Sequence, residues 1–155
     1  MTIAGNNSPA ETGSAYDTPL YAHPSMDTLV ERALELARTP RALLGVVGEP
    51  GAGKSTLAEQ LWTRVESEQP GLAVAVSMDG FHLAQKVIET RGQAARKGMI
   101  DTFDADGFLA LLRRTRAETG NSVWWPEFNR DLEDPVAGAI EVRTGHRLVI
   151  VDGNF

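Results

Sequence analysis

The feature that most constrains this chain is a glycine-rich segment, GEPGAGKST, at positions 48–56. It matches the pattern G-x-x-x-x-G-K-[ST] and lies between a short apolar run at 42–47 and a helical pattern that begins near position 53. The motif requires this strand–loop–helix context, so a chance match is a poor explanation. The alternative, a glycine-rich turn that caps a helix beside a surface lysine, leaves the complete pattern unexplained. The segment therefore predicts a loop that binds the phosphates of a nucleotide.

Each residue type in this loop has a chemical reason. Glycines at positions 48, 51 and 53 let the backbone turn tightly, so that its N–H groups converge on phosphate oxygens at the positive end of a helix. Lys54 can reach the β and γ phosphates, and the Ser55 hydroxyl can ligate Mg²⁺. The residues expected to bind the nucleotide are Gly48, Gly51, Ala52, Gly53, Lys54, Ser55 and Thr56, and Lys54 is also expected to act in catalysis.

The composition is that of an ordinary globular protein, and it excludes several classes of function. The chain has 155 residues, of which 42% are hydrophobic and 23% charged, and its lack of cysteine rules out disulfides, thiolate zinc sites and a cysteine nucleophile. Its net charge of −6 argues against a general nucleic-acid or anionic-membrane binder. No apolar run approaches the roughly 18 residues of a membrane span, and the N-terminus lacks a secretory pattern, so a cytoplasmic protein is expected.

The order of apolar and polar segments predicts an α/β fold. Residues 1–24 are rich in Gly, Ser, Pro, Asn and Thr, so we interpret them as a flexible leader to a P-loop domain at 25–155. A helix is expected from Ser25 until Pro40 stops it. Unbroken apolar strands at 42–47, 72–76 and 148–151 alternate with helical patterns, which is typical of a parallel sheet with helices on both faces.

The second half of the chain carries one further helix and several shorter segments. Residues 84–102 are expected to form a polar connection, and a helix begins at Asp104 and stops at Gly120. Segments 122–125 and 140–142 are interpreted as short strands that flank a loop with two prolines, Pro126 and Pro135.

Two aspartates follow predicted strands and are the candidates for chemistry. The carboxyl ends of parallel strands converge on the ligand crevice, so Asp79 is expected beside an acceptor hydroxyl and Asp152 beside Mg²⁺. Each has a plain alternative: Asp79 caps the next turn, and Asp152 forms a turn with Gly153. Gly80 is expected to let the chain turn away after Asp79. His82 is either a packed residue or a substrate contact.

Five segments in order make the chain from about position 44 to position 155 resemble the uridine kinase, phosphoribulokinase and bacterial pantothenate kinase group of P-loop kinases. They are GEPGAGKST, SMDGFHL, RKGMIDTFDADGF, WPEFNRDLEDPVAGAIEV and VIVDGNF. Within this group the chain looks most similar to bacterial nucleoside/nucleotide kinase family proteins described as fructose-transport-associated kinases. The resemblance implies a P-loop NTPase-type fold and an enzyme that uses ATP and Mg²⁺.

The resemblance also implies roles for residues outside the phosphate loop. Asp79 matches the base or positioning group of the family, and Asp152 matches the acid that assists Mg²⁺, although many relatives carry Glu there. The segments that match RKGMIDTFD and PEFNR border the acceptor pocket in the family. In addition to the candidate His82, the implied substrate contacts are Lys97, Asp101, Phe128 and Arg130.

The resemblance ends before the family pattern does. Relatives continue past the last matching strand with an Arg-bearing lid, helices and further strands, so a C-terminally incomplete domain is expected. In the family the third strand lies between the other two, which would leave 42–47 as an uncovered edge of the sheet. Unpaired N–H and C=O groups on such an edge favour association, for instance as a homo-oligomer.

Three functions are open on the sequence alone. The first is a kinase that transfers the γ-phosphate of ATP to a hydroxyl of a nucleoside, a sugar or a pantothenate-like alcohol, with no nucleic-acid or membrane partner. The second is a GTP switch, but the sequence has no N-K-x-D motif and its D-x-x-G at 104–107 opens a helix. The third is a module that binds ATP without transferring phosphate.

Overall fold

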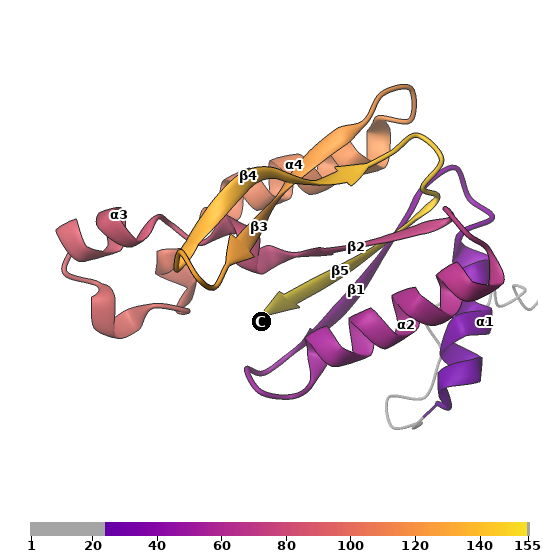
Figure 1. The fold of residues 1–155 in the computed structure, drawn as a ribbon, viewed down its shortest axis with the longest axis horizontal. Helices are drawn as coiled ribbons and strands as arrows, with labels where there is room; N and C mark the ends of the chain where they lie inside the picture. The colour runs from indigo at the N-terminus through magenta and orange to yellow at the C-terminus, as the bar shows by residue number, and fades with distance from the viewer. Residues whose placement is uncertain (1–23, 155) are drawn as a thin grey trace, which may run out of the picture.

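A three-stranded parallel sheet forms the centre of the structure, a computed structural model that describes residues 24–154. β1 (Ala42–Gly48) and β2 (Ala73–Ser77) both pair with β5 (Leu148–Asn154), so the last strand lies in the middle, as the resemblance implies. The three strands run in one direction, and their carboxyl ends lie at the same edge of the sheet (Figure 1). Apart from Pro24, the predicted leader lies outside the described residues.

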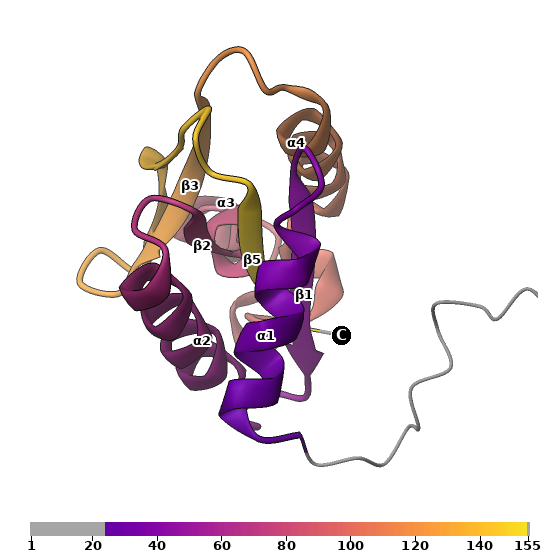
Figure 2. The same ribbon diagram turned by 90° about the vertical axis from the view of Figure 1, so that its right-hand side faces the viewer.

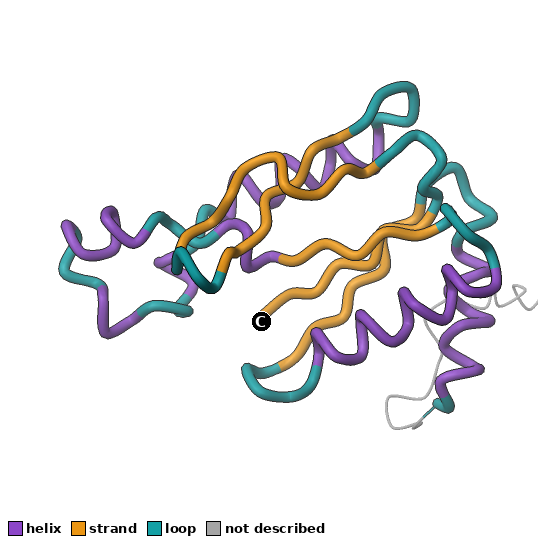
Figure 3. Tube along the Cα trace, viewed as in Figure 1, coloured by secondary structure: helices purple, strands orange, loops and turns teal. Residues whose placement is uncertain are grey.

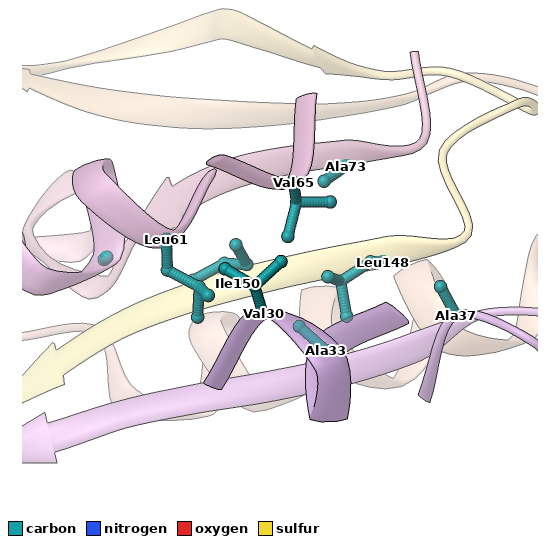
Figure 4. Packing of buried hydrophobic residues seen from close by; sticks show 9 residues of the cluster. Val30, Ala33, Ala37, Leu61, Val65, Ala73, Leu148 and Ile150 are labelled. Carbon is teal, nitrogen blue, oxygen red and sulfur yellow. The ribbon is translucent and has the colours of Figure 1, made fainter. Parts of the chain in front are cut away.

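Two helices cover one face of this sheet. α1 (Met26–Leu36) begins after Ser25, whose hydroxyl accepts a hydrogen bond from the Thr28 N–H, and α2 (Lys54–Glu68) follows the phosphate loop. Their apolar stripes pack against the sheet (Figure 4). The buried residues of this cluster are Val30, Ala33, Ala37, Ala58, Leu61, Val65, Ala73, Leu148 and Ile150.

The opposite face is covered by one helix and a two-stranded ribbon. α4 (Ala105–Ala117) begins after Asp104, and β3 (Val123–Asn129) pairs antiparallel with β4 (Asp134–Val142) (Figure 2). Trp125 of the ribbon is fully buried, and its indole N–H donates to the Thr115 hydroxyl at 2.8 Å. The buried cluster on this face consists of Val74, Val76, Phe81, Val123, Trp125, Val142, Val149 and Val151. Helices on both faces of a parallel sheet confirm the predicted α/β class.

The ribbon replaces the proline-containing loop that the sequence predicts. Pro126 lies within β3, where the pairing register shifts between Trp125 and Glu127. Pro135 lies within β4, opposite Phe128. Proline is tolerated here because a two-stranded ribbon consists of edge strands, in which an N–H can face away from the partner. The expectation of a loop was therefore wrong at both prolines.

The connection at 84–102 is also more ordered than its polar sequence predicts. It folds into α3 (Gln85–Thr90) and two 3₁₀ turns, η2 (Ala94–Arg96) and η3 (Ile100–Thr102) (Figure 3). Ile88 on α3 is fully buried, so one apolar side chain anchors this segment. Within residues 24–154, no helix has both the length and the apolar character needed to cross a bilayer.

A buried arginine ties together three segments at the end of the sheet opposite the phosphate loop. Arg41 is 4% exposed, and its guanidinium donates to the backbone carbonyls of Thr115, Glu118, Arg143 and His146. Burial lowers the pKa of Arg41, while the charge of Glu118 acts in the opposite direction. One side chain thereby satisfies carbonyl groups at the end of α4 and in the turn between β4 and β5.

β1 forms one edge of the sheet within the described residues. It pairs with β5 on one side, and the Val47 side chain near its end is 67% exposed. This is the arrangement that the resemblance implies for the strand at 42–47. Association through this edge remains a prediction.

Candidate functional site

The phosphate loop makes the tight turn that its glycines predict. Gly51 and Gly53 both have φ of 80°, in the left-handed region that other residues rarely adopt. The Ala52 N–H donates to the Glu49 carbonyl at 3.2 Å, which closes the turn. α2 then begins at Lys54, and its N-cap glycine offers no side-chain acceptor to the N–H groups of the first turn. These groups and the positive end of the helix are available to an anion.

Lys54 lies folded over the same loop. Its Nζ donates to the Glu49 carbonyl oxygen at 2.8 Å, and its Cδ lies 3.7 Å from the place that a Cβ on Gly48 would take. The aliphatic part of the lysine thus lies in van der Waals contact with the backbone at position 48. The bond to Glu49 has a neutral acceptor, and a phosphate oxygen would replace it with a shorter, charge-assisted bond. Thr56 follows, exposed, in the first turn of α2.

Ser55 and Asp152 meet beside the loop. The Ser55 hydroxyl donates to Asp152 Oδ2 at 2.5 Å, and the other carboxylate oxygen, Oδ1, is buried and has no hydrogen-bond partner. Pairing with Val46 on one side and Ser77 on the other holds Asp152 at the carboxyl edge of the sheet. A buried carboxylate oxygen without a partner is rare, and beside a serine hydroxyl it fits a hard cation such as Mg²⁺.

These two side chains form a pair of ligands and not a complete cage. Among the described residues, no group of three or more His, Cys, Asp or Glu side chains could hold a metal ion. Mg²⁺ at nucleotide sites is commonly held by one or two protein oxygens together with water and substrate phosphates. The Ser55–Asp152 pair therefore suits a cation that arrives with a nucleotide.

Asp79 lies just past the end of β2, in the 3₁₀ turn η1 (Met78–Phe81). The Ser77 hydroxyl accepts from the Asp79 N–H at 3.1 Å, and Ser77 is the register partner of Asp152. Asp79 thus follows β2, whereas Asp152 lies within the neighbouring strand β5, which runs three residues past the predicted end at position 151. Sequence reasoning missed Ser77, although a serine two residues before a turn aspartate is a recognised turn signal.

Gly80 is required for close packing and not for a change of chain direction. A Cβ at this position would lie 2.4 Å from the Pro126 carbonyl oxygen and 2.6 Å from its carbon. The backbone of β3 thus packs directly against the chain beside Asp79, and only glycine leaves room for it. This contact positions the ribbon relative to the turn that carries the aspartate.

Replacing Gly80 with alanine is expected to destabilise the fold by about 1–3 kcal/mol, because the added methyl group overlaps backbone atoms of the ribbon. Urea unfolding of the variant and the parent measures the loss. Gly45→Ala is the matched control, since the nearest atom to its new Cβ is 3.9 Å away. A Gly80→Ala protein with the parent's unfolding midpoint would contradict the close approach.

Three of the predicted substrate contacts gather in an aromatic cluster next to this turn. The centroid of the His82 ring lies 4.0 Å from that of Phe103 and 5.0 Å from that of Phe128. His82 Nδ1 is 2.9 Å from the Asp79 carbonyl oxygen, and Lys97 Nζ is 5.2 Å from the Phe128 centroid. The structure thus brings His82, Lys97 and Phe128 together, and it also packs the His82 ring closely on Phe103.

Lys97 is fully engaged within the chain. Its ammonium donates to Gln85 Oε1 at 3.0 Å, to the Glu133 carbonyl at 3.2 Å and to Glu133 Oε2 at 2.8 Å. An ammonium has three N–H donors, so these bonds use all of them. The hydrogen bond and charge of Lys97 lower the pKa of Glu133. Lys97 therefore ties the 84–102 connection to the tip of the ribbon, and no sequence motif singled out Glu133.

The other two predicted substrate contacts, Asp101 and Arg130, lie outside the aromatic cluster. Asp101 Oδ2 lies 3.1 Å from the Arg96 guanidinium and accepts from Gln93 Nε2 at 3.0 Å. Arg130 is exposed in the turn after β3, where its charge also lowers the pKa of Glu133. Asp101 thus interacts within the connection, and Arg130 lies on the surface of the ribbon. Their roles as substrate contacts remain predictions.

Comparisons with known sequences find relatives among small-molecule kinases. A Schizosaccharomyces pombe protein named "Putative uridine kinase" is 35% identical over 138 residues, which are 84% of this chain and 58% of that protein. A pantothenate kinase of Enterococcus faecalis is 25% identical over 120 residues, which are 77% of this chain and 39% of that protein. The chain thus spans between 39% and 58% of the length of these two relatives. No family model matches it.

The fold is also that of a solved kinase structure. The crystal structure of a "putative fructose transport system kinase" from Silicibacter sp. TM1040 matches with a TM-score of 0.74 and 36% sequence identity. The match covers 85% of this chain and 64% of the Silicibacter chain. The central sheet, the phosphate loop and the helices around it therefore share one architecture with that protein.

Proposed function

In sequence and in fold this chain fits the uridine kinase and pantothenate kinase group of P-loop kinases, and we propose that it transfers the γ-phosphate of ATP to a hydroxyl group of a small molecule. The observation that carries this proposal is the Ser55–Asp152 pair, with its buried and unpartnered Oδ1, beside the first turn of α2. ATP and Mg²⁺ are the cofactors that suit this arrangement. The relatives' names point to a nucleoside, a sugar or a pantothenate-like alcohol as acceptor.

The phosphate loop and the first turn of α2 bind the nucleotide. The backbone N–H groups around Gly51 and Gly53 surround the phosphates, and Lys54 exchanges the Glu49 carbonyl for a phosphate oxygen. Ser55 and Asp152 would hold Mg²⁺, which supplies positive charge against the charge of the transferring phosphoryl group. The asymmetry of the Asp152 carboxylate, one oxygen bonded and one without a partner, suits this task.

Transfer requires an acceptor oxygen in line with the γ-phosphorus. A bond forms between this oxygen and the γ-phosphorus, the bond from phosphorus to the bridging oxygen breaks, and ADP leaves with that electron pair. The proton of the acceptor hydroxyl passes to the Asp79 carboxylate, which lies in the turn just past β2, the strand that pairs with the one carrying Asp152. The Ser77 hydroxyl and the His82 ring both bond to the backbone of Asp79 and hold its turn.

A coupled assay of ADP release tests the proposal. With ATP and Mg²⁺ present, turnover is expected to rise on addition of a suitable nucleoside, free sugar or pantothenate, and to stop when EDTA removes the metal. Calorimetric titration with ATP measures the affinity for the nucleotide independently of turnover. The alternative function, a module that binds ATP without transfer, predicts binding that no acceptor converts into ADP release. That result across all acceptor classes would overturn the kinase proposal.

A further inference from the structure

The aromatic cluster beside the turn of Asp79 is built from two segments that lie far apart in the sequence. The His82 ring contacts Phe103 and Phe128, at centroid distances of 4.0 and 5.0 Å. Phe103 follows the connection at 84–102, whereas Phe128 belongs to β3 of the ribbon. The resemblance places the acceptor beside these two segments. The shape of this place therefore depends on how the ribbon is held against the connection.

Backbone contacts join Phe103 directly to the turn, but not Phe128. The Leu83 N–H donates to the Thr102 carbonyl at 2.8 Å, and His82 and Phe103 form an antiparallel bridge. The backbone of Phe128 pairs within the ribbon instead. The position of the Phe128 ring beside His82 is therefore set by the position of the ribbon.

The ribbon tip, which comprises residues 129–134, has little buried apolar surface to hold it. Residues 130–133 are all exposed, and Leu132 is 64% exposed. Within the tip, Asn129 Oδ1 accepts hydrogen bonds from the N–H groups of Asp131 and Leu132, both at 2.9 Å. A segment with few buried apolar contacts has a low local stability. The position of the tip must therefore depend on polar contacts with neighbouring segments.

The connection supplies such contacts through Lys97 and Gln85. The Lys97 ammonium donates to Glu133 Oε2 at 2.8 Å and to the Glu133 carbonyl at 3.2 Å. Its third bond goes to Gln85 Oε1 at 3.0 Å, and the Gln85 N–H donates to Asp134 Oδ1 at 2.5 Å. The Lys97 side chain is 24% exposed, and its Nζ lies 5.2 Å from the centroid of the Phe128 ring. Because the lysine is partly shielded from water, its ion pair with Glu133 is screened less than a fully exposed pair.

We propose that Lys97 and Glu133 are a pair of positioning residues: their ion pair closes the ribbon tip on the connection and thereby holds Phe128 beside His82, where the acceptor binds. The proposal rests on the proposed function. It differs from the role that the resemblance implies for Lys97, because the ammonium acts through the ribbon and does not itself bind the acceptor. A wall that is already held in place costs less to order when a ligand binds, so the intact pair lowers the KM for the acceptor.

Charge reversal in the full chain tests the pair, with whichever of uridine, fructose or pantothenate the parent turns over best. In Lys97→Glu and in Glu133→Lys, like charges face each other, and the KM for this acceptor is expected to rise about three- to tenfold. The double variant restores an ion pair of opposite polarity and should bring the KM most of the way back. Both kcat and the KM for ATP should stay at the parent values, since the bonds of this pair lie within the connection and the ribbon.

Lys86→Glu and Asp131→Lys are the matched controls. Lys86 is exposed on α3, and Asp131 is exposed in the same turn as Glu133. These variants make the same charge changes near the pair without altering it, so both should keep the parent's KM for the acceptor. A rise in the controls equal to that in the single variants would show that general charge sets the KM, and would overturn the inference.

Two further kinetic results would overturn the inference and leave the kinase function standing. One is an unchanged acceptor KM in both single variants. The other is a double variant that keeps the raised KM, because a direct bond from the Lys97 ammonium to the acceptor cannot be restored by a lysine at position 133.

Hydrogen exchange separates failure of the pair from failure of the proposed function. The N–H groups of Asp131 and Leu132 report on the ribbon tip, since both bond within it. If no acceptor is turned over, the kinase function fails, and exchange at these two positions still decides the pair. Faster exchange in each single variant that returns to the parent's rate in the double variant supports the pair, and unchanged exchange in the single variants overturns it.

Discussion

Lys54→Ala is expected to lower kcat by about 10²- to 10³-fold and to weaken ATP binding by about tenfold or more. The lysine ammonium lies over the phosphate loop, where its present acceptor is a neutral carbonyl of Glu49 at 2.8 Å. With a triphosphate in the loop, the same donor would face oxygens whose negative charge grows during transfer. Its removal should therefore affect the bound nucleotide and, to a greater extent, the transition state.

Calorimetric titration with ATP and the coupled ADP assay measure the two effects of Lys54→Ala separately. Lys86→Ala is the matched control, because Lys86 is exposed on α3 and lies outside the loop. The control should bind and turn over ATP like the parent. Unchanged ATP binding in Lys54→Ala would contradict the assignment of the loop as the phosphate site, whatever happens to turnover.

The fold around the phosphate loop could be predicted from the sequence because its rules are local. Glycines at 51 and 53 have the positive φ that a tight loop needs, and the helix after them begins where the pattern predicts. One long-range feature followed from topology as well. Since parallel strands end at one edge, a carboxylate near the end of the last strand was expected close to the loop, and Asp152, which lies within β5, bonds to Ser55 there.

Other features of the site depend on contacts that leave no pattern in the sequence. The ribbon passes over Gly80 so closely that a Cβ would meet the Pro126 carbonyl, yet glycine and proline in sequence order read only as turn residues. Arg41 satisfies carbonyls of segments more than 70 positions away, and no spacing rule connects them. Such contacts arise from the packing of distant segments, and they become visible only when the segments are placed in space.

A family resemblance also does not determine the contacts of a predicted substrate residue. Lys97 stands in a family segment that borders the acceptor pocket, but its ammonium bonds to Gln85 and Glu133. A motif specifies the type of a residue and its approximate position in the fold. The hydrogen bonds that its side chain makes depend on which neighbouring segments pack against it.

Asp79→Asn is expected to lower acceptor-dependent kcat by about 10²- to 10⁴-fold, the usual contribution of a positioned general base. The amide keeps the size of the carboxylate but does not take up the hydroxyl proton. The turn should persist, because Ser77 and His82 bond to the backbone of residue 79 and not to its side chain. ATP affinity should stay at the parent value, since the phosphate loop and the Ser55–Asp152 pair are untouched.

The ADP assay at saturating acceptor and the ATP titration together decide the role of Asp79. Asp106→Asn makes the same chemical change at an exposed position in the first turn of α4, and it should leave kcat and ATP binding as in the parent. Loss of turnover with intact ATP binding separates Asp79→Asn from Lys54→Ala, in which both fall. If Asp79→Asn kept the parent's kcat, Asp79 would be a turn residue only, and the proton would have to pass to another group at this edge of the sheet.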